Sequence, residues 1–309
     1  ILFRNAFFGE EKSIQLCDKN AIIAISPDCG SVMNVALNSS LDFFIGGQAK
    51  GHLQVRMPTE LEDISKLNQK AVVSTHSAVV SLPWDCAVLI FKFDENTSDN
   101  VLPTMISRAH NKNITALATS EEYIATGSED CTVRIWDNKN MKHLHCISKH
   151  RSPISAIEIN EKLRICVSIS TDGYVSVNSL VNFEMSCELF TNMKEAVNIS
   201  ISDFGIIAIS QNGPTNGSTI CIFDQNLKFV CSKTLITTRT ICWNDGLDYL
   251  AVAMSDNLIH FFVLPFLDPI SCSINTTGYT VTALAFHKDQ MRMLIGDSMG
   301  KIHVHRFIH

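Results

Sequence analysis

The chain has 309 residues, of which 46% are hydrophobic and 18% charged, and its formal net charge is −6. Its Lys and Arg residues form no runs and do not interleave with aromatic residues, so the sequence does not predict binding to nucleic acid. No stretch approaches the roughly 18–20 apolar residues that a membrane span requires, so we expect no direct membrane insertion.

The first elements in chain order are a strand and a helix. Residues 1–30 are expected to form an N-terminal extension that holds a strand at 20–26 (NAIIAIS), with residues 1–10 as the alternative source of that strand. The best helix candidate is Thr59–Asn68 (TELEDISKLN), whose acidic residues lie near its start, where the helix dipole favours them.

Residues 31–309 contain a unit that recurs every 35–45 residues. Alternating apolar residues lead up to one anchor position in each unit, namely Arg56, Phe91, Trp136, Asn178, Phe223, Phe262 and His305. Period-two alternation indicates strands, and a repeat of about 40–45 residues is typical of a four-stranded propeller blade. The sequence therefore predicts an all-β domain over 31–309, a seven-bladed β-propeller. Because the last unit ends too early to hold an outer strand, we expect the N-terminal strand to close the ring.

The best-formed unit is residues 110–137, HNKNITALATSEEYIATGSEDCTVRIWD, which resembles a WD40 repeat. His110, Thr126, Asp130 and Trp136 stand at the spacings of the structural tetrad of that family. The resemblance implies a buried polar chain that runs from the carboxylate through the imidazole and the hydroxyl to the indole. Because buried polar groups need partners, these residues are interpreted as architecture and not as a catalytic pair.

The other units are degenerate. The fourth keeps His150, Ser168 and Asp172 but has Asn178 where Trp would stand, while the second and sixth keep only Asp85 and Asp256. Such degeneracy is compatible with a propeller, because packing between neighbouring units can replace individual networks.

No motif predicts an enzyme, a cofactor or a metal site. Phosphate-binding glycine loops and nucleophile motifs are missing from the sequence. His143/His145 and His303/His305 each place two imidazoles on one strand face, but a third ligand does not accompany either pair. Eleven cysteines without a CxxC motif indicate buried thiols in a reducing compartment, so a cytoplasmic protein is expected.

The candidate contact residues for a partner protein lie in turns. Trp84 is expected to lie at a turn. Gln211–Ser218 (QNGPTNGS) is expected to be a loop where other units have a tight turn. By topology these fall on one face. The partner-binding candidates are Trp84, Glu129, Thr171, Asn212, Asn216 and Ser255.

Several stretches resemble the C-terminal WD40 domain of BEACH-domain (Beige/Chediak–Higashi) proteins. Those stretches are Trp84-Asp85 with CAVLIFKF, SISTDGYVSVNSL at 168–180, CIFDQNLKFV with TRTICWN, and LIGDSMGKIHVHRF. The resemblance covers residues 75–307 well and residues 1–74 poorly. It implies a non-enzymatic scaffold in vesicle or lysosomal traffic or autophagy, peripheral to endomembranes through a longer parent protein. The start at Ile1 fits that expectation, with a BEACH module upstream.

Two other classes of protein remain open. One is a WD40 subunit of another complex, such as a substrate receptor of a ubiquitin ligase, although Trp136-Asp137-Asn138-Lys139 departs from the WDxR pattern of such receptors. The other is a propeller enzyme, which would need acidic or metal-binding residues from several units around the axis.

Overall fold

The computed structural model describes the strand residues between 15 and 106, and residues 109–308 apart from 192, 194–195, 213–216, 245–248, 287–291 and 299–300. Within those residues the chain is all-β, with 29 strands in seven antiparallel sheets. No helix among them is long and apolar enough to cross a membrane.

Six sheets are built from four strands that are consecutive in sequence, and we number the sheets in chain order. Sheet one holds β3 (Val32–Asn38), β4 (Phe43–Gln48), β5 (His52–Arg56) and β6 (Leu61–Lys66). Sheet two holds β7 (Gln69–Ser74), β8 (Ala78–Pro83), β9 (Val88–Lys92) and β10 (Thr104–Ile106). Sheet three holds β11 (Ile114–Thr119), β12 (Tyr123–Ser128), β13 (Val133–Asp137) and β14 (His143–Ile147).

The later sheets continue the pattern. Sheet four holds β15 (Ile154–Asn160), β16 (Ile165–Ser170), β17 (Tyr174–Ser179) and β18 (Met185–Phe190). Sheet five holds β19 (Ala196–Ile201), β20 (Ile207–Asn212), β21 (Gly217–Phe223) and β22 (Phe229–Ile236). Sheet six holds β23 (Thr238–Asn244), β24 (Tyr249–Met254), β25 (Leu258–Val263) and β26 (Asp268–Asn275). Sheet seven holds β27 (Val281–Phe286), β28 (Arg292–Asp297) and β29 (Lys301–Ile308), joined by β1 (Gln15–Leu16) and β2 (Ala21–Ala24).

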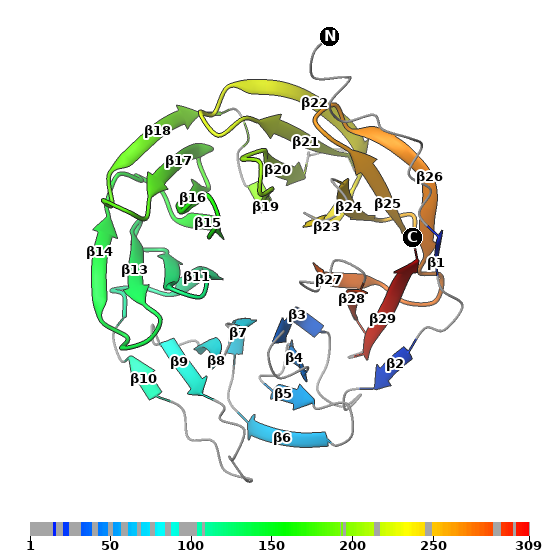
Figure 1. The fold of residues 1–309 in the computed structure, drawn as a ribbon, viewed down its shortest axis with the longest axis horizontal. Coiled ribbons are helices and arrows are strands. Elements are labelled where there is room, and N and C mark those ends of the chain that lie inside the picture. The colour runs from blue at the N-terminus through cyan, green and yellow to red at the C-terminus, as the bar shows by residue number, and fades with distance from the viewer. Residues whose placement is uncertain are drawn as a thin grey trace.

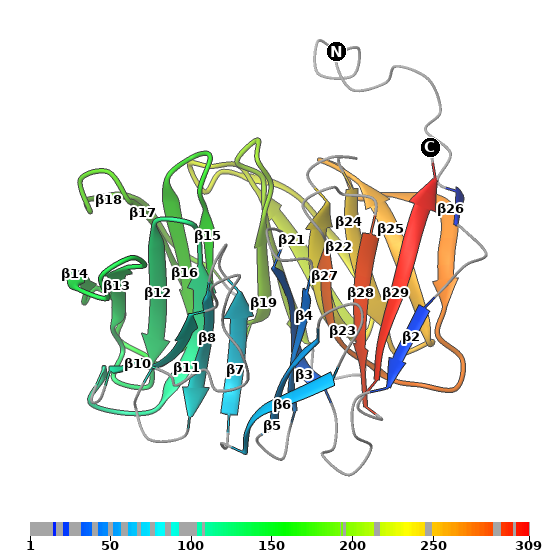
Figure 2. The ribbon, with the colours of Figure 1, turned by 60° about the horizontal axis from the view of Figure 1, so that its bottom comes forward.

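The sheets stand around a common centre, with the first strand of each nearest the middle and the fourth outermost (Figure 1). Seen from the side, the strands run between the two ends of this arrangement (Figure 2). The link into each sheet and the turn between its second and third strands lie at the same end. Hydrogen bonds of 2.9 Å join link to turn, for example from Thr171 N to Pro153 O and from Ser255 N to Thr237 O. We call this end the link face, and the other end the opposite face.

The N-terminal segment pairs with the end of the chain. Residues 21–24 of β2 pair antiparallel with β29, with Ala21 opposite Val304 and Ala24 opposite Lys301. The short β1 pairs with the same strand farther along. Of the segment expected to do so, 20–26, residues 21–24 therefore pair with the last strand.

The expected helix at Thr59–Asn68 is wrong. Residues 61–66 form β6, which pairs antiparallel with β5. A ten-residue helix is marginal on its own, whereas the strand satisfies the otherwise open edge of β5. The loop expected at Gln211–Ser218 is shorter than expected, because Asn212 and Ser218 are paired strand residues of β20 and β21.

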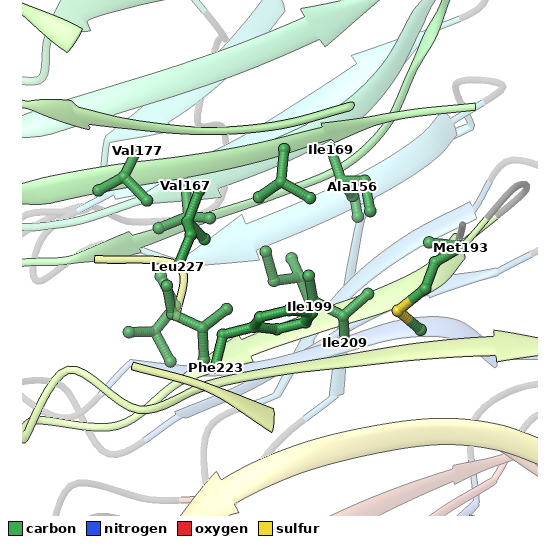
Figure 3. Packing of buried hydrophobic residues seen from close by; sticks show 13 residues of the cluster. Ala156, Val167, Ile169, Val177, Met193, Ile199, Ile209, Phe223 and Leu227 are labelled. Atoms are coloured by element: carbon green, nitrogen blue, oxygen red, sulfur yellow. The ribbon is translucent and has the colours of Figure 1, made fainter. Parts of the chain in front are cut away.

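The hydrophobic core lies between neighbouring sheets. In one such layer, Val167, Ile169 and Val177 of sheet four face Ile199 and Ile209 of sheet five (Figure 3). These side chains are at most 7% exposed. Similar clusters lie between sheets three and four, five and six, and six and seven, so each of these sheets buries apolar side chains against a neighbour.

The turn between the third and fourth strands contains a repeated feature. Four successive sheets place an apolar residue with positive φ four positions after the third strand, namely Met141 (62°), Phe183 (59°), Leu227 (58°) and Leu267 (56°). Leu227 and Leu267 are 5% and 1% exposed, and Leu227 joins the core layer between sheets four and five. The left-handed backbone is tolerated there because the side chain becomes buried.

Gly127 of β12 lies close against sheet four. A Cβ atom at this position would lie 2.5 Å from Ile154 Cγ2 and 2.6 Å from Ile157 Cδ1. Any side chain at this position would therefore require Ile154 and Ile157 of β15 to move.

Candidate functional site

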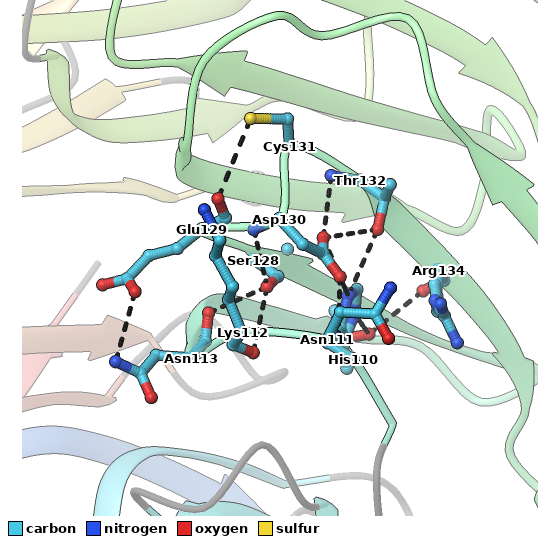
Figure 4. A network of polar contacts seen from close by, with 12 residues as sticks. His110, Asn111, Lys112, Asn113, Ser128, Glu129, Asp130, Cys131, Thr132 and Arg134 are labelled. Atoms are coloured by element: carbon cyan, nitrogen blue, oxygen red, sulfur yellow. Dashed lines mark hydrogen bonds and ion pairs between the residues drawn. The ribbon is translucent and has the colours of Figure 1, made fainter.

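The best-formed polar network lies in sheet three (Figure 4). Trp136 Nε1 donates to Thr126 Oγ1 at 3.0 Å, and the same hydroxyl lies 2.7 Å from His110 Nε2. On its other side the imidazole reaches Asp130, with 3.1 Å between Nδ1 and Oδ2. The four side chains form one continuous buried chain between the link before β11 and strands β12 and β13.

Asp130 is held by more donors than the imidazole alone. Its carboxylate accepts from Thr132 Oγ1 at 2.6 Å, from Thr132 N at 3.0 Å and from Asn111 N at 3.0 Å. Burial alone would raise the pKa of this carboxyl, but the hydrogen bonds from Thr132 and Asn111 and the nearby His110 together lower its pKa to about 2. Asp130 is therefore an ionised acceptor at neutral pH.

Burial lowers the pKa of His110, although Asp130 opposes that shift. A neutral ring has one donor and one acceptor nitrogen. The carboxylate needs a donor, so Nδ1 carries the proton and Nε2 accepts from the Thr126 hydroxyl. With every member satisfied, the network stabilises the link against the sheet and holds no free base.

Sheet four builds a related network from serines. The imidazole of His150 lies 2.8 Å from Ser168 Oγ and 3.0 Å from Ser170 Oγ. Ser170 then donates to Asp172 at 2.7 Å, so the carboxylate reaches the imidazole through a hydroxyl and not directly. On the other side, Ser176 lies 3.1 Å from Ser168.

Asn178 completes this second network in place of an indole. Its Nδ2 donates to Ser176 Oγ at 2.9 Å, so the amide serves as the donor that Trp136 provides in sheet three. Ser170 and Ser176, like Thr132, were not expected from the sequence. Hydroxyl residues are common in strands and turns, and no spacing marks these three as network members.

In sheets six and seven an aspartate at the link face pairs with a histidine on the third strand. Asp256 lies 2.9 Å from His260 Nε2, and the buried Asp297 lies 2.8 Å from His303 Nε2. The imidazole of His303 also stacks on Tyr279, with ring centroids 4.0 Å apart. Each imidazole thus has a protein partner that fixes its orientation.

Among the described residues, no three His, Cys, Asp or Glu side chains come together in a way that could hold a metal ion. In the His143/His145 pair, His143 packs edge-on against Trp136 and His145 stacks on Phe183. Burial lowers the pKa of His305 to about 4. These imidazoles take part in packing within and between sheets.

Four of the six partner-binding candidates lie at the link face of four different sheets. Glu129 and Thr171 are half-buried in second-to-third turns, and Ser255 is exposed in the equivalent turn of sheet six. Asn212 is exposed at the end of β20, where its Oδ1 accepts from Ser218 at 2.6 Å. Trp84 and Asn216 lie outside the described residues.

Four basic residues at the same face were not expected from the sequence. They are Lys112, Lys149, Arg151 and Arg239, and each is exposed. They are scattered along the chain, so no basic run could reveal them, and only the fold brings them to one end.

The sequence was compared with known protein families and proteins. Residues 102–137, which run from β10 through β13, match the family described as WD domain, G-beta repeat. The chain is 23% identical over 197 residues, 63% of its length, to p21-activated protein kinase-interacting protein 1-like of Danio rerio, covering 52% of that protein. It is 36% identical over 70 residues (22% of its length) to a U3 snoRNP-associated protein-like protein of Arabidopsis thaliana, covering 15% of it.

A third relative carries the domain that the sequence resemblance named. It is the BEACH domain-containing protein lvsD of Dictyostelium discoideum, 36% identical over 67 residues, which is 19% of this chain and 2% of that protein. The chain spans about half the length of the Danio rerio relative and far less of the other two. With its buried His–Asp network and its four-stranded antiparallel sheets, the chain contains a WD40 repeat.

Proposed function

We propose that the chain is a non-enzymatic docking platform for other proteins, built as a seven-bladed WD40 propeller. The observation that carries the proposal is the common placement of Glu129, Thr171, Asn212 and Ser255 at the link face of successive sheets. Short turns presented side by side on rigid sheets are well suited to binding a partner, because little conformational entropy is lost on association.

The proposed ring closes through the N-terminal segment. In this arrangement residues 1–30 form an extension that contributes the closing strand, and residues 31–309 form the blades. The antiparallel pairing of β2 with β29 supports the closure. A closed ring would leave no sheet face without a neighbour, which favours a stable platform.

A narrower proposal is that this platform belongs to a BEACH-type scaffold. The match to the Dictyostelium protein supports it, although relatives without that printed description match the chain as well. In that case the protein would be cytoplasmic, peripheral to endomembranes through its parent chain, and act in vesicle or lysosomal traffic or autophagy. No disulfide joins the eight cysteines that the structure describes, which is compatible with a reducing compartment. Sequencing the transcript upstream of Ile1 decides this proposal, because a different upstream module would refute it.

The docking proposal is tested by affinity capture with two matched surface variants. Thr171→Arg with Ser255→Arg alters the link face, and Asn182→Arg with Asn226→Arg alters exposed turns of the opposite face. We expect the first variant to lose the partner proteins that the unaltered chain captures and the second to retain them. Equal loss with both variants, or capture of no partner by the unaltered chain, would refute the proposal.

A further inference from the structure

The opposite face of sheets four, five and six carries large apolar side chains that are more than half exposed. They are Val181, Phe204, Phe229 and Phe266, with exposed fractions of 55–66%. Val181 and Phe266 lie in turns between third and fourth strands. Phe204 lies in the turn between β19 and β20, and Phe229 is the first residue of β22. We call these four residues the apolar patch.

Two of these side chains stand where the same turn of other sheets has polar ones. Val181 lies two positions before the residue with positive φ, where sheet three has Lys139. Phe266 lies one position before that residue, where the other three turns have Asn140, Asn182 and Asn226. The turn therefore does not require an apolar side chain at either position.

The other two patch residues differ from sheet three in the same way. β22 begins with Phe229, whereas β14 begins with the exposed His143. Phe204 stands in the turn between the first two strands where sheet three has the exposed Glu122. Neighbouring exposed apolar side chains that the local backbone does not require are typical of a surface that another segment of chain covers.

Contacts between turns bring the patch residues of neighbouring sheets together. Cys231 Sγ donates to Pro265 O at 3.1 Å, which places the turn that bears Phe266 against β22 near its start. Cys187 Sγ donates to Gln225 O at 3.5 Å, which joins the β21–β22 turn to β18. The turns of sheets four, five and six therefore contact one another at this face.

The turn that bears Phe204 belongs to the same surface. A Cβ atom at the adjacent Gly205 would lie 3.0 Å from Gln225 Cβ, so the two turns of sheet five lie against each other. Lys162 of sheet four lies over the Phe204 ring, with 5.6 Å between its Nζ and the ring centroid. Phe204 thus connects the patch to sheet four.

The N-terminal segment joins the fold at this face. β29 follows the turn from β28 at the link face, so it ends at the opposite face, at Ile308. Gln15 of β1 is paired opposite Ile308, so the chain enters β1 from the opposite face. In Figures 1 and 2, β1 lies beside β26, the outer strand of sheet six. β26 begins two residues after Phe266.

The composition and reach of the N-terminal segment match the patch. Residues 1–8, ILFRNAFF, contain five large apolar residues and a single charged one. The six residues between Phe8 and Gln15 allow a span of up to about 25 Å. Since packed sheets are separated by only about 10 Å, this is enough to reach sheet six from the start of β1.

We propose that residues 1–8 of this chain pack across the apolar patch, with Phe7 and Phe8 against Phe266 and Phe229. The contact removes apolar surface on both sides from water. The tether through β1 keeps the segment at a high effective concentration beside the patch. This contact is independent of the docking proposed for the link face, because it lies at the other end of the sheets.

Trypsin cleavage after Arg4 tests the contact in the full chain, because Arg4 lies within the segment and a docked segment must open before it is cut. Mass spectrometry follows the cleavage with time. The patch variant is Phe229→Ser with Phe266→Ser. The matched control is Phe190→Ser with Ile236→Ser, which removes exposed apolar side chains from the link-face ends of β18 and β22. Melting curves establish that both variants are folded.

We expect the patch variant to be cut after Arg4 roughly three to ten times faster than the unaltered chain, because the open segment becomes more populated. The control variant should be cut at the rate of the unaltered chain. A chain with Phe7→Ser and Phe8→Ser should also be cut faster. Adding the patch substitutions to it should give no further acceleration, because the two sets of residues act through one contact.

Equal cleavage rates for the unaltered chain and the patch variant would overturn the proposal. An effect of the patch substitutions that persists when Phe7 and Phe8 are replaced would overturn it as well. Protection of Arg4 that grows with protein concentration and accompanies a dimer in light scattering would assign the patch to a second copy of the chain, and would also overturn the proposal.

Discussion

The phenyl ring of Phe183 lies almost parallel to the imidazole of His145, with ring centroids 5.4 Å apart and planes 11° apart. The two residues belong to different sheets, since Phe183 is in the β17–β18 turn and His145 is in β14. The same phenyl ring meets Tyr123 edge-on at 6.3 Å. The turn with positive φ thus reaches back to the outer part of the preceding sheet and fixes two neighbouring sheets together.

We expect Leu267→Ala to lower the free energy of unfolding by about 2–4 kcal/mol, because the change removes a buried side chain between two sheets. Leu267 is 1% exposed and belongs to the buried cluster between sheets five and six. Urea denaturation measures the change. The adjacent Phe266 is 57% exposed, so Phe266→Ala should leave stability nearly unchanged. Equal effects of the two substitutions would contradict the role assigned to this turn.

Thr126→Val should destabilise the protein by about 1–3 kcal/mol, because it leaves Trp136 Nε1 and His110 Nε2 without a partner in a buried site. Thr126→Ser keeps the hydroxyl and should recover most of the loss. Thermal melting of the two variants separates the hydrogen-bonding effect from the packing effect. If serine were as damaging as valine, the network would contribute little.

Burial lowers the pKa of His150 to about 4, partly opposed by Asp172. Between pH 6.5 and 4 the unfolded chain therefore binds a proton at this residue that the folded chain does not. The stability contribution is present above pH 6.5 and is lost as the pH falls, by about 2 kcal/mol between pH 7.5 and 5. Urea denaturation at both pH values should show a smaller loss for His150→Gln than for the unaltered chain. An identical pH dependence would refute this assignment.

Deleting residues 1–30 should lower the melting temperature and promote self-association, because it removes β1 and β2 and leaves the edge of β29 unpaired. Deleting only residues 1–14 keeps both strands and serves as the control. Melting curves and light scattering report the two effects. If the chain lacking residues 1–30 melted at the same temperature as the full-length chain, closure of the ring by the N-terminal segment would be contradicted.

The local sequence pattern predicted strands correctly where apolar and polar residues alternate strongly. It failed where pairing with a distant strand decided the secondary structure. β11 (Ile114–Thr119) lies in the best-formed repeat unit, 110–137, and it is buried at every second position. Thr59–Asn68 has helix-favouring acids, but the open edge of β5 recruits residues 61–66 into a strand. No local rule could reveal that competition, because the partner strand is not part of the pattern.

Some residues of the polar networks could likewise be predicted from the sequence, and others could not. The spacing of His110, Thr126, Asp130 and Trp136 marks one network because all four residue types are distinctive. The network of sheet four uses serines, which carry no such mark, and it needs the fold to bring Ser170 and Ser176 to His150.

The missing side chain at Gly127 has a consequence for how the molecule tolerates change. A methyl group there would overlap Ile154 and Ile157 of the next sheet at 2.5 and 2.6 Å. Both isoleucines lie in the buried cluster between sheets three and four, so their displacement would disturb the packing of these two sheets against each other. The absence of a side chain at position 127 therefore sets how closely β12 can lie to β15, and even a methyl group there would act on the interface between two sheets more than on its own strand.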